Sequence, residues 1–374
     1  MESSQEPLFR QNASHDANQN AESPAESSLP PDLDQCFTRE AQFYEKLTQQ
    51  RVRCQLCPHG CLVSEGERGS CGVRENRAGV FYTLVHSRLA SVQVDPIEKK
   101  PLFHFLPGSQ AFSIATAGCN VSCSFCQNQD LAQTLPELLP AEYAPPESIA
   151  TLARQSHCQS IAYTYSEPTI SAEFVMDTVD AGHDLGLCSV AISNGYVQTK
   201  ALRSLFGGMD AVKIDLKAFT EKFYREVVHG HLKPVLDALL TLRTMGKWIE
   251  IVYLTIPTLN DSELEIHEMA QWVKSSLGPD VPLHFTQFHP AHQLRGLPIT
   301  PVATLERARA VAQAAGLHYV YIGNVPGHAA QNTYCPGCGK LLVERVGFTA
   351  NKLLVRKDNT CPYCLHGVAG VWQA

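Results

Sequence analysis

Three cysteines with a spacing suited to metal chemistry lie in the loop after an apolar, strand-like run. Cys119, Cys123 and Cys126 form the pattern C-x3-C-x2-C, directly behind a glycine. A structural zinc site takes four ligands and a disulfide takes two cysteines. Three thiolates therefore favour a cubane [4Fe–4S] cluster whose fourth iron has no protein ligand. A zinc knuckle with a distant fourth ligand, or a loop of buried thiols, is the alternative.

A second group of cysteines lies upstream, on a stretch rich in glycine and turns. Its members are Cys54, Cys57, Cys61 and Cys71. Four thiolates can close a tetrahedral zinc site or hold a second iron–sulfur cluster. The spacing matches neither the ferredoxin run nor a regular pair of CxxC motifs. The sequence thus predicts a metal site here without choosing the metal, with free thiols as the alternative and His59 beside the site rather than in it.

A third group lies close to the C-terminus and consists of two CxxC motifs. Cys335 and Cys338 precede a hairpin-like segment of 22 residues, and Cys361 and Cys364 follow it. This arrangement predicts a zinc-ribbon-like module, with iron as the minor alternative metal. In such a module the metal replaces a core that is too small to be stable alone.

Composition limits the compartment and the partners. Eleven of the fourteen cysteines belong to these three groups, which indicates bound metal in a reducing compartment rather than disulfides. The net charge of −7 gives no basic surface, so no nucleic-acid partner is expected. The chain also lacks a signal pattern and any apolar run near the ~20 residues that span a bilayer. We therefore expect a cytoplasmic protein with no membrane contact.

From residue 111 the pattern alternates between strands and helices, which predicts an α/β fold. Six or seven such units would form an open, partial (β/α)6-type barrel with its chemistry at the carboxyl ends of the strands. The expected strands are Ala111–Thr116, Ser160–Tyr165, Leu187–Ser193, Ala211–Asp215, Trp248–Ile256, Leu283–Phe288 and His318–Ile322. The expected helices are Glu147–Gln155, Ile170–Leu185, Thr199–Leu205, Pro234–Met245, Asp261–Leu277 and Thr304–Ala315.

The chain divides into four parts on this basis. Residues 1–35 are polar and predict a disordered tail. Residues 36–108 would hold a short amphipathic helix over Phe37–Gln50 and the Cys-rich extension, residues 109–328 the barrel, and residues 329–374 the zinc-ribbon-like module. Within the extension, the charged segment Asp95–His104 is expected to be a solvated loop, placed where it could cover the site.

Polar side chains stand at successive strand ends of the predicted barrel. Ser166 and Glu167 follow the second strand, Asn194 follows the third, and Asp215 and Lys217 follow the fourth. A helix cap would explain any one of them as a structural residue. Their repetition at the edge that carries the three cysteines instead predicts a ligand-binding mouth.

The motifs together resemble a known family. The chain is similar to the radical S-adenosylmethionine (SAM) enzymes of the pyruvate formate-lyase activating enzyme group, and more closely to the branch called the AmmeMemoRadiSam system radical SAM enzyme. The resemblance runs from about residue 40 to the end. The motifs that carry it are CQLCPHGC with GSCGVR, DPIEKKPLFHF, AGCNVSCSFCQN, YTYSEPT, SNGY, KIDLKAF, and the terminal CPGCGKLLVERVGF with CPYC and GVW.

This resemblance implies a cofactor arrangement. Cys119, Cys123 and Cys126 would hold the [4Fe–4S] cluster, and SAM would bind its open iron. The remaining positions would bind SAM: Phe125 against adenine, Ser166 and Glu167 at the amino group, and Asn194, Asp215 and Lys217 at the ribose and carboxylate. The implied activity is reductive cleavage of SAM to a 5′-deoxyadenosyl radical, which abstracts hydrogen from an unidentified substrate. No further catalytic residue can be assigned.

The resemblance also suggests partners. A low-potential electron donor of the ferredoxin or flavodoxin type is expected, a partner protein is a candidate substrate, and Amme- or Memo-type proteins are expected functional neighbours. Two features depart from the activating enzymes: the extra cysteines precede the core, and the C-terminal module is foreign to them. The resemblance therefore does not identify the substrate of this chain. The alternative function is a metal-stabilised redox-sensing or binding module without SAM turnover.

Overall fold

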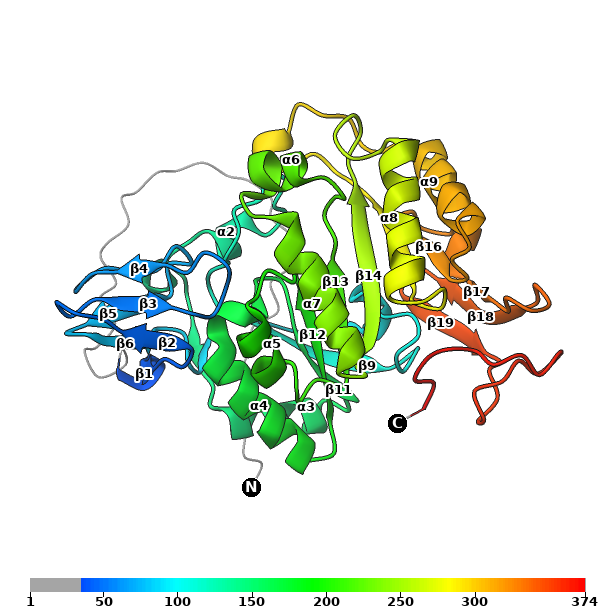
Figure 1. Ribbon diagram of the computed structural model, residues 1–374. Helices are drawn as coiled ribbons and strands as arrows, with labels where there is room; N and C mark the ends of the chain where they lie inside the picture. The colour runs from blue at the N-terminus through cyan, green and yellow to red at the C-terminus, as the bar shows by residue number, and fades with distance from the viewer. Residues whose placement is uncertain (1–34, 374) are drawn as a thin grey trace, which may run out of the picture.

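One large sheet organises the molecule (Figure 1). A computed structural model of the protein describes residues 35–373, so the expected tail lies almost entirely outside the described residues. In the described part, eight strands pair in the order β16-β15-β14-β13-β12-β11-β9-β8. They are β8 (Ser91–Pro96), β9 (Gln110–Ala115), β11 (Ser160–Tyr163), β12 (Cys188–Ser193), β13 (Ala211–Asp215), β14 (Trp248–Thr255), β15 (Leu283–Gln287) and β16 (Val320–Gly323).

The sheet runs parallel from β9 to β16, and β8 pairs antiparallel with β9. Each parallel strand lies beside the next strand in the chain, with a helix between them, which is the winding of a (β/α) barrel. Six helices make these crossovers within the described residues and cover the outer face of the sheet (Figure 1). They are α3 (Pro146–Gln155), α4 (Ala172–Asp184), α5 (Thr199–Leu205), α7 (Leu232–Thr244), α8 (Glu263–Ser276) and α9 (Val302–Ala314).

Helix α8 shows how the sequence produces this layer. Its buried apolar residues Ile266, Met269, Ala270 and Val273 recur at the spacing of one helix face. Ser262 caps the helix by accepting a hydrogen bond from the amide of Glu265. The predicted α/β fold class is confirmed, and every expected barrel strand and helix is present, with its ends shifted by no more than a few residues.

The N-terminal extension is built from short strands rather than from the predicted helix. Two three-stranded sheets form, β1-β6-β5 and β2-β3-β4, at the blue end of the chain in Figure 1. The strands are β1 (Arg39–Glu40), β2 (Tyr44–Lys46), β3 (Val52–Cys54), β4 (Leu62–Val63), β5 (Arg74–Arg77) and β6 (Val80–Thr83). The helix expected over Phe37–Gln50 is wrong, because this segment supplies β1 and β2 and pairs with distant strands: Arg39 with Thr83 and Tyr44 with Cys54.

Most of the segment Asp95–His104 is buried, although Lys99 is exposed, which corrects the expectation of a solvated loop. Asp95, Glu98, Lys100 and His104 are each at most 4% exposed. Their charges are satisfied inside the protein, since Lys100 Nζ lies 2.5 Å from Asp95 Oδ2 and Glu98 accepts a hydrogen bond from the amide of Gly108. A charged segment can be buried when such partners are present.

The remaining elements are short. α2 (Gln129–Ala132) follows the cysteine loop, α6 (Glu221–Phe223) lies after β13, and β10 (Glu142–Tyr143) pairs with β7 (Arg88–Leu89). The C-terminal module is a three-stranded sheet of β17 (Thr333–Tyr334), β18 (Leu341–Val346) and β19 (Thr349–Leu353). Within the described residues, no helix is both long and apolar enough to cross a membrane.

Candidate functional site

A cavity of about 340 Å³ opens at the carboxyl ends of the barrel strands. The three cysteines of the loop after β9 line it, together with the residues that follow β11, β12 and β13. All nine side chains predicted for the cluster and for SAM lie on its wall: Cys119, Cys123, Phe125, Cys126, Ser166, Glu167, Asn194, Asp215 and Lys217. The strand-end prediction therefore placed these residues in one site.

Gly118 fixes the start of the cysteine loop. Its φ of +96° is a conformation that side chains disfavour, and a Cβ there would lie 2.7 Å from Val73 Cγ1 and 2.9 Å from the carbonyl oxygen of Cys71. Only glycine fits between the loop and the N-terminal extension. The position therefore couples the cysteine loop to the segment that carries Cys71.

Cys123 is buried, at 7% exposed, and Cys119 and Cys126 are partly buried. Burial raises the pKa of Cys123 to about 11, against the opposing effect of the Lys217 ammonium. Burial likewise raises the pKa of Cys119 and of Cys126. Because a thiolate is the form that binds metal, a cation in this loop would displace the protons.

The spacing of the sulfur atoms fits a cluster better than a single ion. Within residues 35–373, the only group of three or more His, Cys, Asp or Glu side chains whose ligand atoms all lie within 4.8 Å of one another is the C-terminal one. The sulfurs of Cys119, Cys123 and Cys126 are thus more widely spread. In a cubane each thiolate binds a different iron, so a wider spread is what such a cluster requires.

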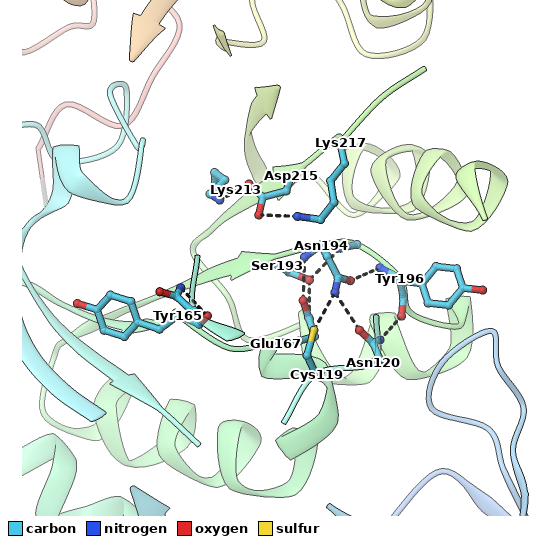
Figure 2. Close-up of polar contacts among 12 residues, drawn as sticks. Cys119, Asn120, Tyr165, Glu167, Ser193, Asn194, Tyr196, Lys213, Asp215 and Lys217 are labelled. Carbon is cyan, nitrogen blue, oxygen red and sulfur yellow. Dashed lines mark hydrogen bonds and ion pairs between the residues drawn. The ribbon is translucent and has the colours of Figure 1, made fainter. Parts of the chain in front are cut away.

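Glu167 presents a buried carboxylate to the cavity (Figure 2). Its Oε1 accepts hydrogen bonds from the amide and hydroxyl of Thr169 at 3.1 and 2.6 Å and from the hydroxyl of Ser193 at 2.7 Å. Its Oε2 accepts one bond, from the amide of Asn194 at 2.8 Å. Burial raises the pKa of Glu167, while these donors oppose the shift. Oε2 keeps room for a further donor from a ligand.

The side-chain nitrogen of Asn194 points at Cys119 and Asn120 of the cysteine loop (Figure 2). Its Nδ2 donates to Oδ1 of Asn120 at 2.9 Å and lies 3.7 Å from Sγ of Cys119, while its Oδ1 accepts from the amide of Tyr196 at 2.8 Å. Asn120 in turn donates to the carbonyl of Tyr196 at 2.6 Å. The amide of Asn194 is thereby fixed beside a candidate cluster ligand.

Asp215 and Lys217 form the charged wall opposite. Asp215 lies 2.5 Å from Lys213 Nζ and 3.6 Å from Lys217 Nζ. Burial alone would lower the pKa of Lys217, but the charges of Asp215 and of Cys123 raise it above its usual value. The Lys217 ammonium also lies 5.4 Å from the centre of the Phe125 ring. Lys217 thus remains a cation between the cysteine loop and Asp215.

Among the other polar residues of the cavity wall, which the sequence prediction did not assign to the site, are Lys99, Lys100, Tyr165 and Lys213. Lys213 could have been found, because it precedes Asp215 by two positions on a predicted strand and so shares its face. The buried segment from Asp95 brings in Lys99 and Lys100, and burial lowers the pKa of Lys100 to about 8. That segment therefore does cover the site, as its position suggested, although it is not solvated.

The C-terminal cysteines lie apart from the cavity and close to each other. Sγ of Cys335 lies 3.6 Å from Sγ of Cys364, and Sγ of Cys338 lies 3.8 Å from Sγ of Cys361. All four fall within 4.8 Å, as one tetrahedral metal ion requires. This site could hold zinc or iron.

The N-terminal cysteines are also gathered. Burial raises the pKa of Cys57, and the charges of Cys54, Cys71 and Cys61 add to the effect, so the four thiols lie within electrostatic reach of one another. They do not line the cavity. His59 donates from Nε2 to the carbonyl of Asn120 at 2.7 Å, which agrees with the expectation that it lies beside the cysteines.

Comparison with known proteins identifies the family. The profile of the Radical SAM superfamily matches residues 113–270. The uncharacterized protein MJ0808 of Methanocaldococcus jannaschii is 45% identical over 327 residues, which cover 87% of this chain and 97% of that protein. A second protein of that organism, MJ0674, is 25% identical over 170 residues, or 44% of this chain and 45% of that one.

Solved structures show partial likeness. A domain of a pyruvate-formate lyase-activating enzyme from Bacteroides vulgatus aligns with a TM-score of 0.40 and 14% identity, covering 44% of this chain and 99% of that one. A radical SAM methyltransferase from Sphaerobacter thermophilus aligns with a TM-score of 0.46 and 16% identity, covering 61% and 71%. From the superfamily profile and the near full-length relative, we conclude that this chain belongs to the radical SAM superfamily.

Proposed function

We propose that the protein binds a [4Fe–4S] cluster on Cys119, Cys123 and Cys126, binds SAM in the adjoining cavity, and uses them to abstract hydrogen from a substrate. Membership of the superfamily implies an iron–sulfur cluster and SAM. The observation that carries the assignment to these residues is their convergence: nine side chains, from four separate segments of the chain, line one cavity, and the three cysteines are among them.

When bound, the reduced cluster supplies the electron that splits SAM into methionine and a 5′-deoxyadenosyl radical. The chain's own residues bind and orient the cofactor. Glu167 has an acceptor position at Oε2 for the amino group of SAM, and Lys217 offers a cation to its carboxylate. Phe125 offers an apolar ring on the same wall. Asn194 acts instead on the cysteine loop, because both ends of its amide are already engaged.

The cavity has the size of a small-molecule site, which is roughly 300 to 1,000 Å³. Enclosure of the radical by the barrel would limit its side reactions with solvent. We propose an activating-enzyme-like oxidoreductase of the AmmeMemoRadiSam type, served by a low-potential electron donor. The likeness of motifs supports this finer assignment, and the substrate, a partner protein or a small molecule, remains open within it.

The experiment is anaerobic SAM cleavage. The protein is reconstituted with iron and sulfide, reduced with dithionite and given SAM, and 5′-deoxyadenosine is measured by mass-resolved chromatography. We expect product with the parent and none with Cys123→Ala. Cys188→Ala, which removes a cysteine outside all three groups, should retain activity. A protein with a loaded cluster that does not bind SAM would overturn the proposal and favour the sensing or binding module.

At the C-terminus we propose a structural metal site on Cys335, Cys338, Cys361 and Cys364. The close approach of all four sulfurs supports a single ion, zinc in preference to iron. None of these four cysteines lines the cavity, which supports a role of the metal in folding.

A further inference from the structure

The four N-terminal cysteines converge through two turns. Cys54 is the last residue of β3, and its backbone amide donates a hydrogen bond to the carbonyl of Cys61 at 2.9 Å. Between them a tight turn forms, in which the amide of Gly60 donates to the carbonyl of Cys57 at 3.1 Å. This hairpin therefore holds three of the four thiols at one end.

The fourth thiol comes from a second turn that packs against this hairpin. The amide of Gly72 donates to the carbonyl of Gly69 at 2.9 Å, and Cys71 lies within this turn. A Cβ built on Gly69 would lie 3.9 Å from Sγ of Cys61, so the backbone of the turn rests directly against that sulfur. The fold thus brings together cysteines that are up to 17 residues apart in the sequence.

The spacing of these sulfurs distinguishes the N-terminal group from the C-terminal one. The four C-terminal sulfurs lie within 4.8 Å of one another, a spacing that suits a single metal ion. No three of the sulfurs of Cys54, Cys57, Cys61 and Cys71 lie within 4.8 Å of one another, although all four residues are described. The same holds for the three cysteines of the barrel. This second comparison rests on the proposed function, because it takes the barrel cysteines as cubane ligands.

The N-terminal group also abuts the loop of Cys119. His59, inside the hairpin, donates to the carbonyl of Asn120, and the carbonyl oxygen of Cys71 lies only 2.9 Å from the position of a Cβ built on Gly118. Gln198 donates from its backbone amide to the carbonyl of Leu56 at 3.0 Å and from Nε2 to the carbonyl of Cys57 at 3.1 Å. Hydrogen bonds therefore attach the hairpin to the barrel at the edge that carries the site.

A buried ion pair lies beside these cysteines. Arg74 follows Cys71 by three residues and is 1% exposed, and its Nη2 lies 2.6 Å from Oε1 of Glu173 on α4. The two charges balance each other, and the pair fixes the segment after Cys71 against the barrel.

We propose that Cys54, Cys57, Cys61 and Cys71 hold a second iron–sulfur cluster, packed against the loop that carries the cluster of the radical site. No three of the four sulfurs lie within 4.8 Å of one another, which favours a cluster over a single zinc ion. The group also lies on the barrel edge that carries the other predicted cluster, away from the C-terminal module.

The test separates this site from the radical site. The variant Cys119→Ala/Cys123→Ala/Cys126→Ala removes the ligands of the first cluster and leaves the N-terminal group intact. The protein is expressed with iron, purified without oxygen, and analysed for iron, acid-labile sulfide and zinc, with Mössbauer spectra of ⁵⁷Fe-enriched samples. We expect about four iron and four sulfide per chain in this variant, as one cubane contains.

A further change in the same background assigns the iron. Cys61→Ser, at a partly exposed position, should remove this iron, whereas Cys188→Ser, also partly exposed, should leave it in place. If circular dichroism shows that Cys61→Ser is unfolded, Cys71→Ser, at another partly exposed position, is the second test. Two zinc ions per chain without sulfide would overturn the proposal, and so would iron that survives the loss of Cys61 and of Cys71.

Failure of the two proposals can be told apart. Iron and sulfide retained in the triple variant, together with a parent that binds no SAM, would overturn the proposed function and support the second cluster. SAM cleavage by the parent, together with a triple variant that holds zinc alone, would do the reverse.

Discussion

The side-chain amide of Asn194 lies 3.7 Å from Sγ of Cys119, with its nitrogen directed at the sulfur. Asn194 follows the third strand of the barrel and Cys119 follows the first, so the contact ties two strand ends together across the site. A hydrogen bond to a thiolate ligand is one of the features that set the potential of an iron–sulfur cluster. If Cys119 holds the proposed cluster, this contact gives Asn194 a positioning role that its place at a strand end does not reveal.

Replacing Asn194 by alanine should lower the reduction potential of the cluster on Cys119, Cys123 and Cys126. The lost N–H donor stabilises the reduced cluster, which carries more negative charge, more than the oxidised one. SAM cleavage should fall by roughly 10- to 100-fold, the usual effect of removing a group that orients a metal ligand. A redox titration followed by electron paramagnetic resonance measures the potential.

The matched control is Asn324→Ala, which removes another asparagine of the cavity wall. Asn324 donates to the carbonyl of Gln287 and, among residues 35–373, has no hydrogen bond to a cysteine. Its loss should leave the potential unchanged. Equal reduction potentials in the parent and in Asn194→Ala would show that the Asn194 amide does not tune the cluster.

Arg74→Met should destabilise the protein by roughly 3 to 5 kcal/mol, because it leaves the carboxylate of Glu173 buried without its cation. Both side chains are 1% exposed, and Arg74 Nη2 lies 2.6 Å from Glu173 Oε1. The pair joins the N-terminal extension to α4 of the barrel. Urea unfolding followed by circular dichroism measures the loss.

A double-mutant cycle completes this prediction. Arg74→Met/Glu173→Gln should recover part of the stability, since no unpaired charge remains in the interior. Arg77→Met is the control, because Arg77 pairs with Glu75 at the surface, where ion pairs contribute about 1 kcal/mol or less. If Arg74→Met costs no more than Arg77→Met, the buried pair does not stabilise this junction.

The barrel could be predicted from the sequence because its signals are local. Each strand is a short apolar run followed by a helix with one apolar face, as in α8, and parallel strands that succeed one another bring their ends to one edge. Glu167, Asn194 and Asp215 were placed in one site by that rule alone. The detailed roles were not, because the direction of the Asn194 amide depends on Asn120, which lies in the cysteine loop.

The N-terminal extension could not be predicted in the same way. Its segment Phe37–Gln50 has helical spacing, but its backbone pairs with strands up to 44 residues away, and such pairings override local preference. The charges of Asp95–His104 likewise suggested a solvated loop. They are buried because Tyr165 and Arg345, both remote in the sequence, contact Asp95 and Glu98.

Acid should destabilise the base of the barrel through His104. Its Nδ1 donates to the carbonyl of Ala369 at 2.6 Å, so Nε2 accepts the hydroxyl of Tyr321 at 2.5 Å and the ring is neutral. Burial lowers the pKa of His104 to about 4. The unfolded chain has a histidine pKa of about 6.5, so stability is fully present above that value and is lost as the pH falls towards 4.

The free energy of unfolding should fall by roughly 3 kcal/mol across this window. The pKa of His104 differs by about 2.5 between the folded and unfolded chain, and each pKa unit corresponds to about 1.36 kcal/mol. Urea unfolding at a series of pH values measures this fall. His104→Gln should flatten the pH dependence between 6.5 and 4, whereas His318→Gln, at a partly exposed position, should leave it as in the parent. A dependence in His104→Gln as steep as in the parent would mean that other groups cause the acid sensitivity.

Cys338→Ala should lower the stability of the C-terminal module and leave SAM cleavage largely intact. The module has a small core around Leu342, Val343 and Trp372, so a metal on its four cysteines replaces missing apolar burial. Loss of one ligand should release the metal and cost roughly 4 kcal/mol or more, as losses of structural metals do. Metal analysis, thermal unfolding and limited proteolysis between β17 and residue 364 measure these effects.

The same variant tests how firmly the module supports the barrel. Arg345, on β18, donates to the carbonyl of Phe103 at 2.6 Å, and this bond joins the module to the buried segment that covers the site. Because neither Arg345 nor Phe103 lines the cavity, we expect cleavage of SAM by Cys338→Ala at a temperature where the module is still folded. Loss of cleavage there, equal to that in Cys123→Ala, would show that the C-terminal metal acts in the reaction and not only in folding.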